Sequence, residues 1–168
     1  RALRPAIMWM DVRAHQEAQD VLATGDEALL LNGAGQGPVS AEWMIPKALW
    51  LKRNEPQTFA DAHRICEYQD FLTYRLTGTW AASLDNAGLR WHYRSRSGGW
   101  ASSLLATLDL SELEQKWPER VVAPGEVIGT LTSAAANELG LSANVKVVQG
   151  GADALIGLGT SHHHRGAT

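Results

Sequence analysis

The stretch Val145-Lys146-Val147-Val148-Gln149-Gly150-Gly151-Ala152-Asp153-Ala154 decides the fold class of this chain. Its first four residues are alternating and β-branched, which predicts a short buried strand. Gly150 and Gly151 end that strand, and the apolar residues from Ala152 onward predict a helix. Asp153 is therefore expected in the first turn of a helix that directly follows a strand. In α/β folds, this is the place where a reacting ligand binds.

Three properties of this junction favour chemistry at Asp153. Because glycines lack a Cβ atom, Gly150 and Gly151 allow backbone and substrate to approach closely. The free N–H groups and the positive dipole at a helix start favour an anion such as a phosphoryl group. The same dipole keeps a first-turn carboxylate ionised and able to accept a proton. Spacing alone favours the simpler alternative, a helix cap at Asp153, so both roles stay open at this point.

Length and composition narrow the class of protein. The chain has 168 residues, 45% of them hydrophobic and 20% charged, which suits one globular domain with its own core. A net charge of −3 argues against a general nucleic-acid binder, which carries a basic stripe. Its one cysteine, Cys66, excludes an internal disulfide and is typical of a reducing compartment, so we expect a cytoplasmic protein. No apolar run approaches the ~20 residues that span a bilayer, and Arg1 to Pro5 do not resemble a signal peptide, so no membrane partner is expected.

A second strand is predicted near the start of the chain. The continuous apolar run from Ala6 to Met10 is typical of a strand covered on both faces of a parallel sheet. It ends at Asp11-Val12-Arg13, after which a helix is expected from Ala14 to about Ala23. The polar pair at this junction is either a set of ligand contacts or a local ion pair, and the sequence favours neither.

The middle of the chain predicts helices with recognisable ends. Ser40 is the expected N-cap of a helix over residues 41–53, which Pro46 should kink or interrupt. Glu42, at the mouth of this helix, is the one residue there that is placed to meet a polar ligand. Pro56 is expected to begin the next short helix.

Two further helices have start and stop signals. Asp70 is a candidate N-cap for a compact helix that Gly78 ends in a left-handed conformation. Later in the chain, residues 121–131 predict a turn and a strand. Thr132 should then cap a small-residue helix that Gly140 ends.

Three other segments resemble functional motifs, but each has a simpler interpretation. The loop from Gly33 to Gly37 lacks the preceding strand and the Lys-Ser/Thr of a phosphate loop, so we predict a turn. Residues 80–100 mix aromatic and basic side chains, which favours a packing or sugar-facing loop over a single-stranded nucleic-acid site. Adjacent histidines do not share a helical face, so His162–His164 belong to a tail of unclear origin at 161–168, and we predict no metal ligands.

Six blocks of this sequence, in this order, resemble the FGGY family of carbohydrate kinases. The resemblance covers about residues 3 to 160, and Arg90-Trp91-His92-Tyr93 is similar to an element of the ribulokinase-like members. Single blocks are weak signals, but six in the right order are specific, and they shift the interpretation of Asp153 from cap to catalysis. The blocks are Leu3–Ala14, Ser40–Trp43 with Pro46, Lys47 and Trp50, Ile65–Asp70 with Tyr74–Gly78, Arg90–Tyr93, Pro124–Thr132 and Gln149–Ala154.

The resemblance implies an ATP-dependent kinase of a sugar or polyol. It implies an α/β fold of the actin-like ATPase (ribonuclease H-like) type, a mixed sheet with helices on both faces that is incomplete at both ends. Residues 1–160 would be part of the N-terminal, sugar-binding domain. The substrate would be a pentulose such as ribulose or xylulose. Two alternatives stay open: a kinase of another polyol such as glycerol or erythritol, and a non-catalytic binding or scaffold module of the same superfamily.

Residue roles also follow from the resemblance. Asp153 would be the catalytic base, because a carboxylate of pKa about 4 suffices to orient a hydroxyl and to take its proton late. ATP and Mg²⁺ would bind largely outside this chain, since the Asp-x-Gly-Thr phosphate loop and the second, adenosine-binding domain of the family are absent. The chain is therefore expected to be an inactive fragment, with a homodimer of the parent protein as an open possibility. The substrate-binding residues would be Trp9, Asp11, Glu42 and Arg90, the last in place of a lysine, with Gly150 and Gly151 as glycines that the phosphate approaches.

Overall fold

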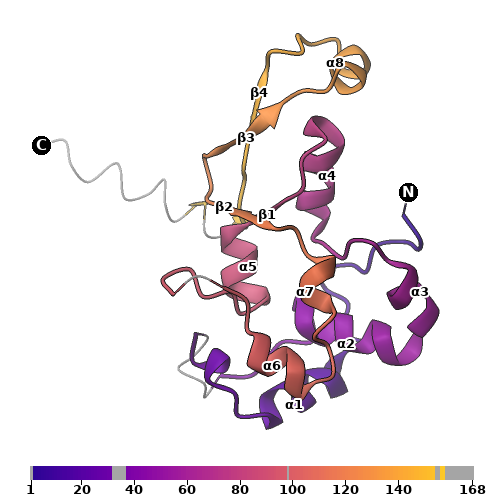
Figure 1. Cartoon of the computed structure of the whole chain (residues 1–168), viewed down its shortest axis with the longest axis vertical. Helices are drawn as coiled ribbons and strands as arrows, with labels where there is room; N and C mark the ends of the chain where they lie inside the picture. Colours follow the sequence, from indigo (N-terminus) through magenta and orange to yellow (C-terminus); the bar gives the residue numbers. More distant parts are fainter. Residues whose placement is uncertain (1, 32–36, 98, 154–155, 158–168) are drawn as a thin grey trace, which may run out of the picture. The chain divides into compact units, whose positions relative to one another are not determined.

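The computed structural model describes residues 2–31, 37–97, 99–153 and 156–157 (Figure 1). The chain divides into two compact units, each built from two segments. Unit 1 comprises Arg1–Ile65 and Gly88–Trp117, and unit 2 comprises Cys66–Ala87 and Pro118–Thr168. Residues 33–36 of the predicted loop Gly33–Gly37 lie outside the described residues, as do the histidines at 162–164.

The regular elements in the described part of unit 1 are all helices. Its interior is formed by large apolar side chains that are fully buried, including Leu104, Leu105 and Leu113. Trp117 stacks on Trp91, with ring centroids 5.1 Å apart, so the aromatic segment predicted to pack does so. The elements are α1 (His15–Ala23), the 3-10 helix η1 (Glu27–Leu31), α2 (Met44–Asn54), α3 (Pro56–Asp61), α6 (Ser102–Thr107), α7 (Leu113–Lys116) and the end of α5 (Leu84–Arg90), which begins in unit 2.

The helix boundaries in unit 1 agree with the sequence in part. The predictions for α1 and for Pro56 at the start of α3 are confirmed. The prediction for α2 is wrong at its start, because Trp43 is the N-cap and Ser40 instead accepts a hydrogen bond from the Glu42 N–H. Pro46 consequently lies in the first turn of α2, where its missing N–H has no helical partner to lose.

The strand predicted from Ala6 to Met10 is absent. Met8, Trp9 and Met10 are each about 60% exposed, and no strand assignment covers this segment. A strand needs a neighbour for its backbone hydrogen bonds, and the described residues place none beside this run. The carbonyls of Met8 and Trp9 instead accept hydrogen bonds from the Lys47 ammonium, at 2.8 and 3.3 Å.

Unit 2 combines helices with two small sheets, so the α/β class and the mixture of parallel and antiparallel pairing are confirmed. In the first sheet β1 pairs parallel to β2, with Ala81 opposite Arg120, and in the second β3 pairs antiparallel to β4. The connection between β3 and β4 contains α8 and extends away from β1 and β2 (Figure 1). The elements are α4 (Tyr68–Thr77), β1 (Ala81–Ser83), the start of α5, β2 (Arg120–Val122), β3 (Val127–Thr130), α8 (Ser133–Leu139) and β4 (Lys146–Val148).

Local capping signals in unit 2 are mostly read correctly. Gly78 ends α4 with a φ of 72°, Gly140 ends α8 with a φ of 67°, and the Thr132 hydroxyl accepts a hydrogen bond from the Ala135 N–H. The prediction of Asp70 as an N-cap is wrong, because α4 begins earlier, with Glu67 as its N-cap. Asp70 is the third helical residue, and its side chain accepts a hydrogen bond from the Glu67 N–H.

The strand at the start of the fold-defining stretch exists but is not buried. Val145 and Val148 are 39% and 51% exposed, because β4 pairs only with β3 in the described part of unit 2.

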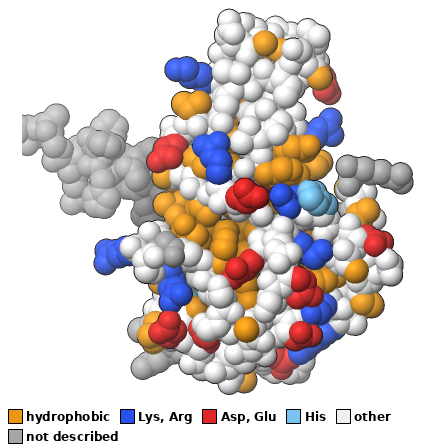
Figure 2. Space-filling model, in the orientation of Figure 1, with side chains coloured by type: hydrophobic (Ala, Val, Ile, Leu, Met, Phe, Trp, Pro, Cys, Tyr) orange, Lys and Arg blue, Asp and Glu red, His pale blue; other side chains and the backbone are white. Residues whose placement is uncertain are grey.

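On the face shown in Figure 2, acidic and basic side chains are interspersed over the surface. Over the residues that the structure describes, every helix is too short or too polar to cross a membrane.

Candidate functional site

The turn that carries Asp153 is anchored to the β3–β4 sheet through Gln149. Its N–H donates to the carbonyl of Glu126, and its own carbonyl accepts from the Gly125 N–H, both at 2.8 Å. The Gln149 side chain is 1% exposed. These two bonds extend the sheet pairing by one residue, so the chain enters the glycine turn at a fixed position.

Polar side chains from α4 and β1 surround Gly150. Its carbonyl accepts hydrogen bonds from the Ser83 hydroxyl and from the Gln149 amide, each at 3.2 Å. A Cβ atom added at Gly150 would lie 3.2 Å from Nε2 of Gln69, which is tighter than an ordinary contact. The Gln69 oxygen in turn accepts from the Asn86 amide at 3.4 Å. A side chain at Gly150 would therefore displace the Gln69 amide by a few tenths of an ångström.

The space beside Gly151 is filled by a second carboxylate. A Cβ at Gly151 would overlap Oδ2 of Asp85 and would lie 3.0 Å from the Ile156 side chain. Burial raises the pKa of Asp85 above its usual value. Sequence reasoning assigned the missing Cβ to the approach of a substrate, whereas in this structure Asp85 occupies it. No local pattern indicates that contact, because Asp85 and Gly151 are far apart in the chain.

Asp153 lies at the start of a helical turn, as predicted. Asp153, Ile156 and Gly157 are helical, and the Ile156 N–H donates to the carbonyl of Ala152 at 3.0 Å. Residues 154 and 155 lie outside the described part. Asp153 is exposed, so its carboxylate is accessible to a ligand. An exposed carboxylate in the first turn of a helix can accept a proton from a hydroxyl that binds beside it.

Asp70 is a buried carboxylate near this turn. Its residue is 0% exposed, and its two oxygens accept hydrogen bonds from the N–H groups of Ser83 (3.2 Å) and Glu67 (3.3 Å). Burial raises the pKa of Asp70 to about 7, and the charge of Glu67 adds to this rise. Burial, together with the charges of Asp70 and Glu67, also raises the pKa of the Cys66 thiol to about 12, so the thiol is unreactive at neutral pH.

In unit 1, Asp11 and Arg13 form a forked ion pair. The Arg13 Nε lies 2.9 and 3.0 Å from the two Asp11 oxygens, and its Nη2 lies 2.8 Å from Oδ2. Hydrogen bonds from Arg13 lower the pKa of Asp11 to about 2, with smaller effects of the Arg13 and Lys47 charges. The Arg13 guanidinium also lies 4.7 Å from the Trp50 ring centroid. The local ion pair is therefore present, and it holds an ionised carboxylate at the surface.

The Lys47 ammonium lies beside the segment that carries Trp9 and Asp11. Its ammonium bonds to the Met8 and Trp9 carbonyls and its charge acts on Asp11, while the Trp9 side chain remains 60% exposed. Glu42 and Arg90 are both partly exposed. These predicted sugar contacts all belong to unit 1, whereas Asp153 belongs to unit 2.

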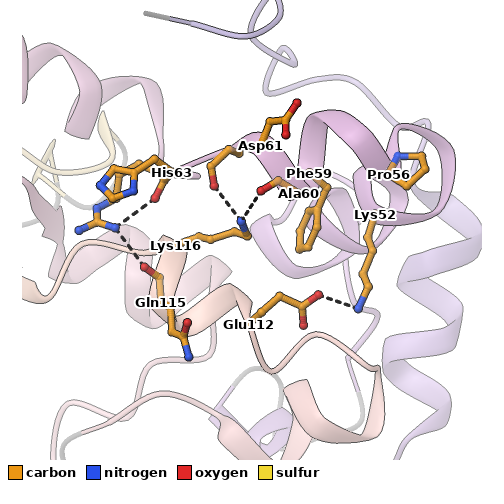
Figure 3. A pocket seen from close by; sticks show the side chains of 11 residues that line it. Lys52, Pro56, Phe59, Ala60, Asp61, His63, Glu112, Gln115 and Lys116 are labelled. Atoms are coloured by element: carbon orange, nitrogen blue, oxygen red, sulfur yellow. Dashed lines mark hydrogen bonds and ion pairs between the residues drawn. The ribbon is translucent and has the colours of Figure 1, made fainter.

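A hollow of about 780 Å³ in unit 1 has a structural explanation (Figure 3). None of the predicted site residues lines it. Its basic side chains tie the end of α3 to the neighbourhood of α7 and α2, which accounts for their positions without a ligand. Lys116 donates to the carbonyls of Ala60 and Ala62, Arg64 to the carbonyl of Gln115, and Lys52 to the carboxylate of Glu112.

The described residues do not fit a divalent cation by themselves. Among them, no group of three or more His, Cys, Asp or Glu side chains comes together as metal ligands. Asp70 is already held by two backbone N–H groups, and Asp85 is directed at Gly151. No catalytic step is therefore assigned to a metal on these residues.

Comparison with known proteins gives consistent matches. Residues 1–158 match the model of the FGGY family of carbohydrate kinases, N-terminal domain. The chain is 32% identical over 154 residues to a xylulose kinase from Escherichia coli (strain K12), covering 91% of this chain and 30% of that protein. It is 32% identical over 167 residues to a D-ribulokinase from Saccharomyces cerevisiae, covering 90% of this chain and 23% of that protein.

A solved structure agrees with these relatives. The crystal structure of a xylulose kinase from Rhodospirillum rubrum superposes with a TM-score of 0.74 at 27% identity, covering 89% of this chain and 30% of that one. The predicted resemblance and the fold of sugar kinases of the actin-like ATPase type are thereby confirmed. The chain spans about 30% of the length of the first curated relatives that it matches.

Proposed function

The chain belongs to the FGGY family of carbohydrate kinases, and we propose that it supplies the sugar-binding surface and the catalytic base of a pentulose kinase. Kinases of this family in general use ATP and a divalent metal ion to phosphorylate a small sugar. One observation carries the proposal: within the family match, an exposed aspartate, Asp153, begins a helix directly after an anchored two-glycine turn.

The reaction does not need a strong base. Phosphoryl transfer to an alcohol passes through a loose transition state, so the protein mainly positions the groups and stabilises charge. Asp153 is proposed to orient the sugar hydroxyl and to take its proton late, when the new bond to phosphorus has largely formed.

The sugar contacts are proposed on unit 1. The exposed Trp9 ring offers a platform for the apolar face of a sugar, and the ionised Asp11 offers two hydrogen-bond acceptors. Glu42, two residues before α2, and Arg90, the last residue of α5, are proposed as further polar contacts. Ribulose or xylulose is the proposed substrate, in line with the relatives named xylulose kinase and D-ribulokinase.

The 168-residue chain by itself is expected to be inactive. It spans about 30% of its relatives' length, and its described residues gather no ligand set for a metal. Catalysis of phosphoryl transfer depends mainly on stabilising the charge on the transferring phosphoryl group, so a chain without the groups that do this should not catalyse the reaction. Isothermal titration of this chain with ATP and Mg²⁺ should show no saturable binding below about millimolar concentration, and micromolar binding would contradict the expectation.

Substitution of Asp153 in the full-length protein tests the proposal. Asp153→Asn keeps the size of the side chain but removes the proton acceptor, so kcat should fall by roughly 10² to 10⁴, with a smaller effect on the sugar KM. Asp61→Asn, which changes an exposed aspartate of α3, is the matched control and should keep normal turnover. Assays with xylulose, ribulose and glycerol identify the substrate. Near-normal turnover of Asp153→Asn would return this residue to a capping role.

A further inference from the structure

A continuous hydrogen-bonded path joins the start of α4 to the glycine turn of unit 2. The Glu67 N–H donates to one oxygen of Asp70, and the other oxygen accepts from the Ser83 N–H. The Ser83 hydroxyl then donates to the carbonyl of Gly150 at 3.2 Å. This last contact joins residues that are 67 positions apart in the sequence.

The path is buried at Asp70 and Ser83, both 0% exposed, and reaches the surface at Gly150, which is exposed. Gln149, which also donates to the Gly150 carbonyl, is 1% exposed. The buried bond from the Ser83 N–H to Asp70 is stronger and more directional than a bond at the surface, so it holds Ser83 in place. Ser83 belongs to β1, whose three residues are all fully buried, so its hydroxyl has little freedom to choose another partner.

The orientation of the Gly150 carbonyl sets the direction in which the backbone continues toward Asp153. Two successive glycines can adopt many backbone conformations, so the turn needs external contacts to hold one of them. The sheet contacts of Gln149 fix the entry to the turn, and the Ser83 hydroxyl fixes the peptide plane after Gly150. Asp153 follows three residues later and has no sheet pairing of its own in the described structure.

We propose that Ser83, held by Asp70, is a positioning residue that fixes the Gly150 carbonyl and so aims the Asp153 carboxylate at the sugar hydroxyl. The inference rests on the proposed role of Asp153 as the base. A displacement of about 1 Å at a reacting group can cost about 10²-fold in rate, so loss of one buried hydroxyl can act on catalysis at a distance.

The experiment is a double-mutant cycle of Ser83→Ala and Asp153→Asn in the full-length kinase. Ser83→Ala should lower kcat by about 10- to 100-fold and change the sugar KM by less than about threefold, because ground-state binding of the sugar is left intact. Ser83→Cys, which keeps the volume but donates weakly, should lie between the wild type and Ser83→Ala. It also provides a second test should Ser83→Ala fold poorly.

The matched control removes a buried hydroxyl elsewhere in unit 2. Thr73 donates its hydroxyl to the carbonyl of Asp70 within α4 and is 6% exposed, so Thr73→Val loses a similar bond without reaching Gly150. Thr73→Val should lower the melting temperature about as much as Ser83→Ala and leave kcat unchanged. An equal loss of kcat in both variants would show a merely structural role and would overturn the inference.

The cycle separates this inference from the proposed function. If Ser83 acts through Asp153, the double variant should be no slower than Asp153→Asn alone, within about threefold. Losses that multiply, or an unchanged kcat in Ser83→Ala and Ser83→Cys beside a large loss in Asp153→Asn, overturn the positioning role and leave the base intact. Near-normal kcat in Asp153→Asn rejects the base itself, and the positioning role with it.

Discussion

The two compact units differ most in what fills their interiors. Unit 1 buries Trp91 and Trp117 beside the half-buried Trp100 and several leucines, whose packing requires contact but little direction. In unit 2 the buried apolar residues are small or few, such as Ala81, Val122 and Ile128. Five of the seven buried polar or charged residues in the described part belong to unit 2: Asp70, Thr73, Ser83, Asn86 and Gln149.

The two kinds of interior do different things: apolar packing stabilises the fold, and buried polar bonds fix the orientation of groups. Apolar packing gives free energy in proportion to the area removed from water, and it tolerates small shifts of its members. A buried polar network gives less net free energy, but each bond fixes a direction, and an unmade bond is costly. The position of the glycine turn in unit 2 depends on such bonds, so substitutions among the buried polar residues of unit 2 should act on turnover and pH dependence. Substitutions in the apolar interior of unit 1 should act on stability.

The largest effect is expected from Trp117→Ala in unit 1. Trp117 is 1% exposed, stacks on Trp91 and packs at a tilt against Trp100, at centroid distances of 5.1 and 4.7 Å. Truncation of a buried tryptophan leaves a cavity and costs about 3–5 kcal/mol. Hydrogen exchange of peptides that cover α6 and α7 in the full-length protein should show this loss as faster local opening.

A milder substitution at the same position sharpens the contrast. The indole N–H of Trp117 has no partner among the described residues, so Trp117→Phe removes an unsatisfied donor together with part of the ring. Its cost should be clearly smaller than that of Trp117→Ala. A large loss of kcat without faster exchange, in either variant, would show that the apolar interior of unit 1 acts on turnover and not only on stability.

The second effect is a dependence of stability on pH through Asp70. Its pKa is about 7 in the folded protein against 3.8 for the unfolded chain, because burial disfavours the charged form. The folded state therefore binds more protons between these values, and its stability falls as the pH rises through this window. The contribution is fully present below about pH 4 and is lost as the pH passes about 7, with a total of a few kcal/mol.

Local hydrogen exchange of α4 and β1 at pH 5, 6 and 7 measures this slope, after correction for the intrinsic exchange rate. Asp70→Asn cannot ionise and should flatten it, whereas the exposed control Asp61→Asn should keep it. The groups that face Asp70 are Glu67, whose charge adds to the rise in its pKa, and Cys66, whose thiol stays protonated in this range. Equal slopes in wild type and Asp70→Asn would contradict the prediction.

The fold features that sequence could predict are those decided within a few residues. Thr132 and Gly140 bound α8 as expected, because a hydroxyl N-cap and a left-handed glycine act locally. The run Ala6–Met10 has the composition of a strand, but strand formation depends on a neighbour that composition does not encode. The start of α2 was misplaced for a related reason: the Ser40 hydroxyl forms a turn with Glu42 instead of capping the helix.

The candidate site shows the same division. The place of Asp153 after two glycines followed from local pattern, and the family resemblance added its expected role. The contact from Ser83 to Gly150 spans 67 residues and the contact from Asp70 to Ser83 spans 13, so neither has a periodic signal. Only the fold brings β1 beside the turn, and the polar interior of unit 2 is accordingly the part that sequence reasoning missed.

A smaller effect is expected from Thr132→Ala, which tests whether every directional hydrogen bond in unit 2 affects kcat or only those at the glycine turn. The Thr132 hydroxyl caps α8 at 3.1 Å, and its loss should cost about 1 kcal/mol of local stability. Because α8 is held by apolar packing of Ala135 and Ala136 with Leu131, and not by the contacts at the glycine turn, kcat should not change. Thermal unfolding beside steady-state kinetics checks both halves. A loss of kcat like that of Ser83→Ala would show that directional contacts throughout unit 2 matter, and not only those at the turn.

The smallest effect on stability, and a specific one on substrate binding, is expected from Arg13→Gln. Exposed ion pairs contribute little to folding, so melting should not change. Without the Arg13 fork the Asp11 pKa should rise from about 2 toward 3.8, which leaves the carboxylate ionised at neutral pH but free to rotate. If Asp11 binds the sugar, loss of a fixed acceptor should raise the sugar KM about 3- to 10-fold with kcat nearly constant. Arg53→Gln is the control for KM, because Arg53 pairs with Asp20 at 2.6 Å and with the buried Glu17 at 3.4 Å and is no predicted sugar contact, so it should leave KM unchanged. An unchanged sugar KM in Arg13→Gln would show that Asp11 and Arg13 form only a local ion pair. The proposed sugar contact at Asp11 would then be wrong.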